Sequence, residues 1–161
     1  KLRLLKEKVD RLVKQPGVFW RGMVGQKELA QALAASGFWV YPTSWPETSC
    51  ITSMKAQALG CIPITSRYRD SGVPETTQYD LGPPSRDGMI ENDRQWQQDW
   101  VDAVLAAHAR TDLDDYRRLM KTWARETFSW RKVAEQWDAE WKARSSEVLK
   151  SESRPTLSLV T

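Results

Sequence analysis

The stretch Tyr41–Gly60, YPTSWPETSCITSMKAQALG, decides the fold together with CIPIT at 61–65 directly after it. The pattern predicts a strand over 38–42, a polar loop over 43–49 and a helix from about residue 50 to residue 59, closed by Gly60. CIPIT predicts a second short strand. Strand, helix and strand at such short intervals favour a parallel sheet covered by helices, and so an α/β fold.

Upstream of this stretch the same alternation continues. Apolar residues at helical spacing predict an amphipathic helix over 1–14, ended by Pro16-Gly17. VFWRGMV at 18–24 predicts a buried strand, and Leu29–Leu33 marks a second helix. The chain begins at Lys1 inside a helical pattern, so we expect the natural N-terminus to lie upstream.

The amino-acid composition changes after residue 65. Residues 66–95 are rich in Gly, Pro, Ser, Asp and Arg, which predicts a loop with a short strand near Met89-Ile90. Three helices are expected from about residue 93, the last one capped by Ser129. Its apolar stripe is predicted to pack in the core and consists of Trp130, Val133, Trp137 and Trp141. The Ser-rich tail, 145–161, is predicted to be disordered.

The composition restricts the classes of function that the chain can have. The chain has 161 residues, enough for one domain, and 40% are hydrophobic, with nine Trp to build a core. Its net charge is +3 and no basic run dominates, which argues against nucleic acid as a partner. Cys50 and Cys61 form no CxxC pair and His108 is the only histidine, so neither a metal site nor a disulfide framework is expected. Unpaired cysteines are consistent with a cytoplasmic protein, and no apolar run is long enough to span a bilayer.

The loops that leave the two strands carry the candidate binding residues. In an open parallel sheet, ligands bind beyond the carboxyl ends of the strands, where the loops 43–50 and 66–76 begin. The first loop leads into a helix N-terminus, whose free amides and dipole attract a phosphate group. Those amides belong to Thr48, Ser49, Cys50 and Ile51. Glu47, just before them, is suited to accept hydrogen bonds from sugar hydroxyls, although it would also stabilise the helix dipole without any ligand.

At these residues the sequence resembles the C-terminal domain of the GT-B glycosyltransferases of the group 1 family, family 4. The matching pieces lie between about Val18 and Trp141 and are Pro42-Thr43, Pro46-Glu47, Ala56–Gly60, Pro63 and Gly72–Glu75. The resemblance implies a Rossmann-like parallel sheet with flanking helices over 1–144, a partial GT-B C-terminal domain, with C-terminal helices from about residue 93. It also implies that Gly72 belongs to a glycine-rich loop at the donor site.

The sequence departs from that family in two respects. The family has a second Glu seven residues after the first, to accept hydrogen bonds from the ribose, and here that position is Lys55, which donates but does not accept. Lys55 is equally interpretable as a solvated helix lysine. In addition, nothing before residue 18 matches the family's first strand–helix unit, with its diphosphate-binding Arg and Lys, and the acceptor-binding N-terminal domain is absent.

The resemblance implies transfer of a sugar from a nucleotide-diphosphate sugar to an acceptor, with retention and with no cofactor or obligatory metal. Arg67 and Arg69, just past the second strand, are candidates for contacts to the diphosphate. The nucleotide base, the sugar and the acceptor stay open. The location implied is the cytoplasm, with any attachment to a membrane supplied by the missing part. Two alternatives remain: a non-catalytic relative that acts as a binding or interaction module, supported by Lys55 and the missing unit, and a basic nucleic-acid module, supported only by the pI of about 8.9 and the Trp content.

Overall fold

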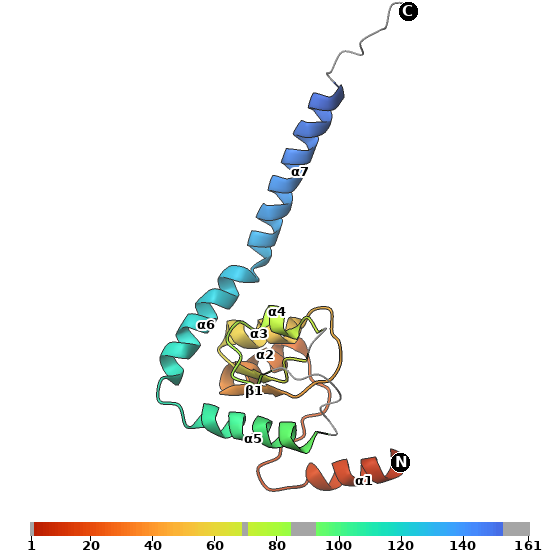
Figure 1. Ribbon diagram of the computed structural model, residues 1–161, viewed down its shortest axis with the longest axis vertical. Coiled ribbons are helices and arrows are strands. Elements are labelled where there is room, and N and C mark those ends of the chain that lie inside the picture. Colours follow the sequence, from red (N-terminus) through yellow and green to blue (C-terminus); the bar gives the residue numbers. More distant parts are fainter. Residues whose placement is uncertain (1, 69–70, 85–92, 153–161) are drawn as a thin grey trace, which may run out of the picture.

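The computed structural model describes residues 2–68, 71–84 and 93–152, with side chains up to residue 147. Helices dominate these ranges, and two short strands lie among them (Figure 1). In chain order the elements are α1 (Leu2–Leu12), α2 (Gln26–Ala35), β1 (Phe38–Tyr41), α3 (Ile51–Leu59), β2 (Ile62–Thr65), α4 (Val73–Thr76), α5 (Arg94–His108), α6 (Leu113–Thr127) and α7 (Trp130–Glu152).

The two strands form a parallel sheet, as the sequence predicts. Phe38 lies opposite Ile62, and Tyr41 lies opposite Thr65, so both strands end at the same edge. α3 is the crossover between them, which is the connection that parallel strands require. The chain is therefore an α/β structure with a two-stranded parallel sheet in its described residues.

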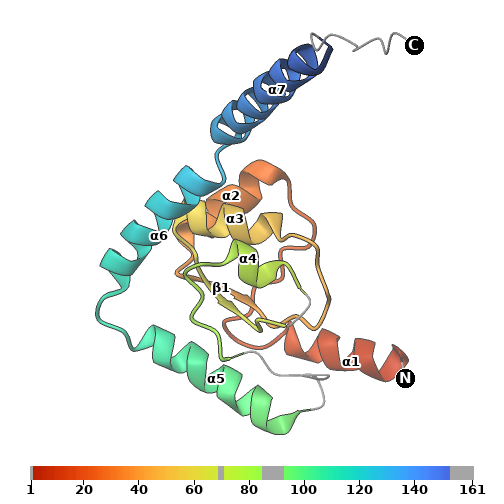
Figure 2. The same ribbon diagram turned by 45° about the horizontal axis from the view of Figure 1, so that its top comes forward.

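The core lies between this sheet and the helices. Every residue of β2 is buried, and the side chains of Ile62 and Ile64 are fully so. Leu33, Ala56 and Cys61 form a buried cluster, against which Leu29, Trp39 and Leu59 pack. Figures 1 and 2 show α2, α3 and α4 gathered beside the sheet, while α5 and α6 run around the outside.

The C-terminal end of α3 is held by α6. Gly60 ends the helix at a left-handed φ of 95°, the conformation for which glycine is favoured. On α6, Arg117 Nε donates to the Gly60 carbonyl oxygen at 2.9 Å, and Arg125 Nε donates to that of Ala58 at 3.0 Å. Two guanidinium groups thus satisfy carbonyls that the end of a helix leaves free, and their charge complements the helix dipole.

The segment 18–24 is not a buried strand, contrary to the sequence prediction. It has no regular structure, and the side chains of Phe19, Trp20 and Met23 are 84%, 77% and 102% exposed. An isolated strand leaves its backbone groups unpaired, so an apolar run becomes a strand only beside a partner. Within the described residues β1 pairs with β2 alone, and 18–24 pairs with neither strand.

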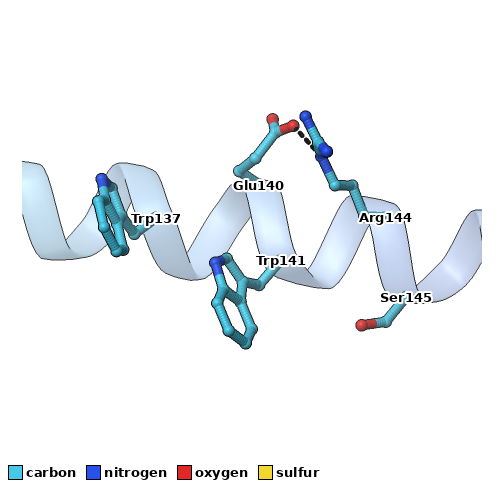
Figure 3. Close-up of a pocket in the computed structure, with 5 residues that line it drawn as sticks. All are labelled: Trp137, Glu140, Trp141, Arg144 and Ser145. Carbon is cyan, nitrogen blue, oxygen red and sulfur yellow. Dashed lines mark hydrogen bonds and ion pairs between the residues drawn. The ribbon is translucent and has the colours of Figure 1, made fainter.

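The helix α7 also differs from its prediction. It begins after Ser129, whose side chain caps it by accepting from Lys132 N at 3.2 Å, as expected. However, Trp130, Trp137 and Trp141 are 86%, 66% and 69% exposed, so the predicted core stripe is wrong. α7 leaves the rest of the molecule (Figure 2), and Trp137 and Trp141 lie along this helix (Figure 3), where none of the described elements buries them. It continues to Glu152, so 145–152 is helical where the sequence predicts a disordered tail.

Some expectations lie outside the described residues, namely the strand near Met89-Ile90 and the remainder of the tail from residue 153. Within the loop predicted over 66–95, the structure has one turn of helix, α4, that the sequence analysis does not predict. Among the described residues, no helix is long and apolar enough to cross a membrane.

Candidate functional site

The two loops that leave the sheet are joined to each other at both ends. Near the strands, the Ser66 hydroxyl accepts from Thr43 N at 3.0 Å and also bonds the Thr43 carbonyl oxygen. Farther out, Gly72 N donates to the Glu47 carbonyl oxygen at 2.5 Å. The sequence prediction that both loops lie at one edge is therefore confirmed, and hydrogen bonds fix their positions relative to one another.

Gly72 allows this close approach. A Cβ at this position would lie 2.3 Å from the Thr48 carbonyl oxygen and 3.1 Å from Ser49 N, well inside van der Waals contact. Gly72 is itself buried behind the first loop. It is thus placed where it sets the path of Thr48 and Ser49.

Glu47 is positioned by a tyrosine from the preceding strand. The Tyr41 hydroxyl hydrogen-bonds Glu47 Oε1, and the Tyr41 ring stacks on Trp39 with centroids 4.9 Å apart. The hydrogen bond to Glu47 and then burial raise the pKa of Tyr41, because the tyrosinate form would face a carboxylate. Tyr41 therefore stays a neutral donor, and it orients the half-buried Glu47 carboxylate.

The first turn of α3 lies next to this carboxylate. Cys50 is the N-cap residue of α3, and its thiol lies near the backbone amides of Thr52 and Ser53 without making a regular capping hydrogen bond. Burial raises the pKa of the Cys50 thiol to about 11, opposed by the backbone amides of Ser53 and Thr52 and reinforced by Glu47. The thiol is thus neutral at ordinary pH, and a neutral thiol is a poor nucleophile.

Glu47 and this helix N-terminus open into one hollow of about 300 Å³. Its lining combines aromatic, carboxylate and helix-start groups from Trp39, Tyr41, Glu47, Ser49, Cys50, Ile51 and Thr52. Four of the five consecutive residues predicted from the sequence, all but Thr48, therefore line one space. An oriented carboxylate accepts hydrogen bonds from hydroxyl groups, and free amides at a helix start donate to an anion.

Lys55 lies away from this hollow. It is exposed one turn along α3, and its Nζ donates to Gln26 Oε1 at the start of α2, at 2.8 Å. A lysine at this place ties α3 to α2. This contact agrees with the interpretation of Lys55 as a surface lysine. Lys55 does not line the hollow beside Glu47.

Arg67 is bound to a buried carboxylate. Its Nε lies 3.2 Å from Asp80 Oδ2, and its Nη2 donates to the Asp80 carbonyl oxygen at 2.6 Å. The Asp80 side chain is 2% exposed and also accepts from Thr65 N, Thr65 Oγ1 and Gly82 N. These bonds hold Arg67 in a left-handed conformation, φ 45°, which is costly for a non-glycine residue. Arg69 lies outside the described residues.

Sequence reasoning missed five residues that shape this edge, Trp39, Tyr41, Thr52, Ser66 and Asp80. For the first two a signal existed, because alternate residues of a strand share one face and Tyr41 precedes Glu47 by one short loop. Nothing in the pattern pointed to Ser66 or Asp80, since most of their partners, backbone groups and for Asp80 also the Thr65 and Arg67 side chains, are distant in sequence and brought near by folding.

Within the described ranges, His, Cys, Asp and Glu side chains form no group of three or more that could hold a metal ion. Compared with models of protein families, with curated proteins and with solved structures, the chain matches none.

Proposed function

We propose that this chain is the donor-binding part of a glycosyltransferase that takes a sugar from a nucleotide-diphosphate sugar and transfers it with retention. The observation that carries the proposal is the shared hollow of Glu47 and the α3 N-terminus, at the edge where two parallel strands end. The helix start donates hydrogen bonds to an anion, and the neighbouring carboxylate accepts hydrogen bonds from hydroxyl groups. This combination suits a molecule that carries both phosphate and sugar.

The residues divide the work by their chemistry. The amides of Ser49, Cys50 and Ile51, which line the hollow, bind a phosphate group of the donor, and Glu47 accepts hydrogen bonds from hydroxyls of the sugar. Negative charge grows on the diphosphate when the glycosidic bond breaks, and fixed dipoles stabilise that charge without reorganising. Arg67 lies at the same edge of the sheet, but its guanidinium group is paired with Asp80 and does not line the hollow, so it is not assigned to the diphosphate.

We further propose that the two-stranded sheet is one part of a wider parallel sheet, as in a Rossmann-like domain. The single pairing of β1 within the described residues is consistent with that arrangement. The acceptor-binding domain of the proposed enzyme would lie outside this chain.

Calorimetry with the 161-residue chain tests the proposal, because binding does not require the acceptor. We expect UDP, GDP or ADP to bind, one in preference to the others, and the matching sugar nucleotide to bind more tightly than the free diphosphate. Glu47→Gln should remove most of that difference, and Glu126→Gln on the outer helix α6 is the matched control. A chain that binds none of these nucleotides, while its circular dichroism shows it folded, contradicts the proposal.

One observation favours a second function, a non-catalytic binding module descended from such an enzyme. Lys55 occupies the position of the family's second Glu and is bonded to Gln26 instead of facing the hollow. Lys55→Glu restores the carboxylate. If the variant binds nucleoside diphosphate at least about tenfold more tightly than the natural chain, about 1.4 kcal/mol, the module interpretation is preferred.

A further inference from the structure

The helix α1 exposes its whole apolar stripe. At 100° per residue, Leu2, Leu5, Val9 and Leu12 fall on one face. Their exposed fractions are 84%, 57%, 43% and 42%, and no residue of the helix is buried. An amphipathic helix gains most of its stability from covering such a stripe, so this face is suited to a further contact.

Cations surround this face. Lys6 and Lys8 flank the stripe on its two sides, Arg3 and Arg11 lie on the opposite face, and Lys14 follows in the turn after the helix. The two carboxylates of the helix pair internally, Glu7 with Arg3 at 3.6 Å and Asp10 with Lys6 at 2.5 Å. All four of these side chains are at least half exposed, so the net charge of the helix faces solvent.

The segment after α1 has the same character. Phe19, Trp20 and Met23 are exposed in an irregular stretch, with Arg21 between them. Residues 2–23 together hold six Lys and Arg side chains and two carboxylates. Trp and Phe beside cations are typical of segments that lie at the boundary between lipid head groups and acyl chains.

We propose that residues 2–23 form a membrane-surface arm that lies on an anionic lipid surface. The apolar stripe and Trp20 enter the head-group boundary, and Lys6 and Lys8 reach outward to lipid phosphates. The exposed apolar surfaces of residues 2–23 and of α7 differ in charge, and this difference indicates which of them binds an anionic surface. α7 carries four cations and four carboxylates over 130–147, which gives an anionic surface no net attraction.

This inference does not depend on the Glu47 hollow, and its test uses different groups. The full chain is mixed with vesicles of phosphatidylcholine alone, or of phosphatidylcholine with phosphatidylglycerol, and sedimented. We expect sedimentation with the anionic vesicles, a blue shift of Trp emission, and weakening by added salt as the attraction is screened. Absence of binding to anionic vesicles at low salt would overturn the proposal.

Neighbouring leucines provide a matched pair of variants. Leu5→Asn alters the stripe, whereas Leu4→Asn makes the same change about 100° away, at a leucine that is 65% exposed. We expect Leu5→Asn to weaken vesicle binding about tenfold or more, and Leu4→Asn to weaken it much less. Equal effects of the two variants would show that the stripe is not the contact surface.

The cations are tested in the same way. Lys6→Gln with Lys8→Gln should weaken binding about fivefold for each charge removed, while Arg131→Gln with Lys132→Gln on α7 removes equal charge elsewhere and should change little. Light scattering of the chain without vesicles tests whether a second copy of the chain covers the stripe instead. If the stripe instead pairs two copies, the mass doubles, Leu5→Asn restores the monomer and vesicles do not compete, which contradicts the proposal.

Discussion

The compact part of the molecule, from α2 to α4 with α6, differs from its two exposed parts, the N-terminal segment 2–24 and α7. Both kinds of region contain large apolar residues at regular spacing. In the compact part Ile62 and Ile64 are fully buried, whereas in the exposed parts Trp20 and Trp137 are 77% and 66% exposed. The difference teaches that spacing determines which face of an element is apolar, and that burial depends on a neighbouring element at the right place.

The largest expected effect is in β2. Ile64→Ala should lower the free energy of unfolding by about 2–5 kcal/mol, because it leaves a cavity in a fully buried strand. Leu5→Ala in α1 should lower it by less than about 0.5 kcal/mol, because that side chain is already in water. Urea denaturation measures both, and equal effects would break the comparison.

The second-largest loss of stability is expected for a substitution of Asp80. Asp80→Ala removes the buried acceptor of Thr65, Gly82 and Arg67 and should cost about 3 kcal/mol of unfolding free energy. Its control in α7 is Asp138→Ala, which breaks an exposed pair with Lys142 and should cost less than about 0.5 kcal/mol. Thermal unfolding followed by circular dichroism would distinguish a buried network from a surface pair.

Gly72→Ala sharpens the comparison inside the compact part. The added methyl would meet the Thr48 carbonyl oxygen at 2.3 Å, so the two loops must separate, at a cost of about 1–3 kcal/mol. Gly37→Ala is the control, because its Cβ has only Arg117 Nη2 nearby, at 3.9 Å. A neutral Gly72→Ala would show that the loops are not held together as described.

The effect that is smallest near neutral pH is a pH dependence. Burial raises the pKa of both Cys50 and Cys61 to about 11, so the folded chain keeps protons that the unfolded chain releases from about pH 9. Stability from these groups is complete below pH 9 and falls as the pH rises toward 11. Cys61→Ala should make the fall shallower in urea titrations at several pH values. The folded chain should also react with a thiol reagent much more slowly than the unfolded chain at pH 8.

The parts of the fold that the sequence predicted correctly are those whose partners are close in the chain. The strands at 38–41 and 62–65 face each other across a single helix, and the Gly60 stop and the Ser129 cap depend on adjacent residues. The prediction for 18–24 was wrong because a strand depends on a partner that the described residues do not supply. Helical periodicity found the Trp stripe of α7 but contains no information on what covers it.

The candidate site was predictable to a similar degree. Glu47 and the residues up to Ile51 are consecutive, so placing the loop at the sheet edge brought most of them together. The roles of Tyr41 and Asp80 depend on side-chain orientation and on backbone groups distant in sequence, which no spacing reveals. Lys55 is predicted as a residue of α3, but its partner Gln26 is 29 positions away.

The double attachment between the two sheet-edge loops has a consequence for observing ligands. Because Ser66 holds Thr43 and Gly72 holds Glu47, a displacement of either loop is transmitted to the other. A molecule that touched only the carboxylate side would therefore also shift the amide resonances of Ser66 and Gly72. Those two signals report occupancy without direct contact, and they remain usable when the aromatic signals of the hollow overlap.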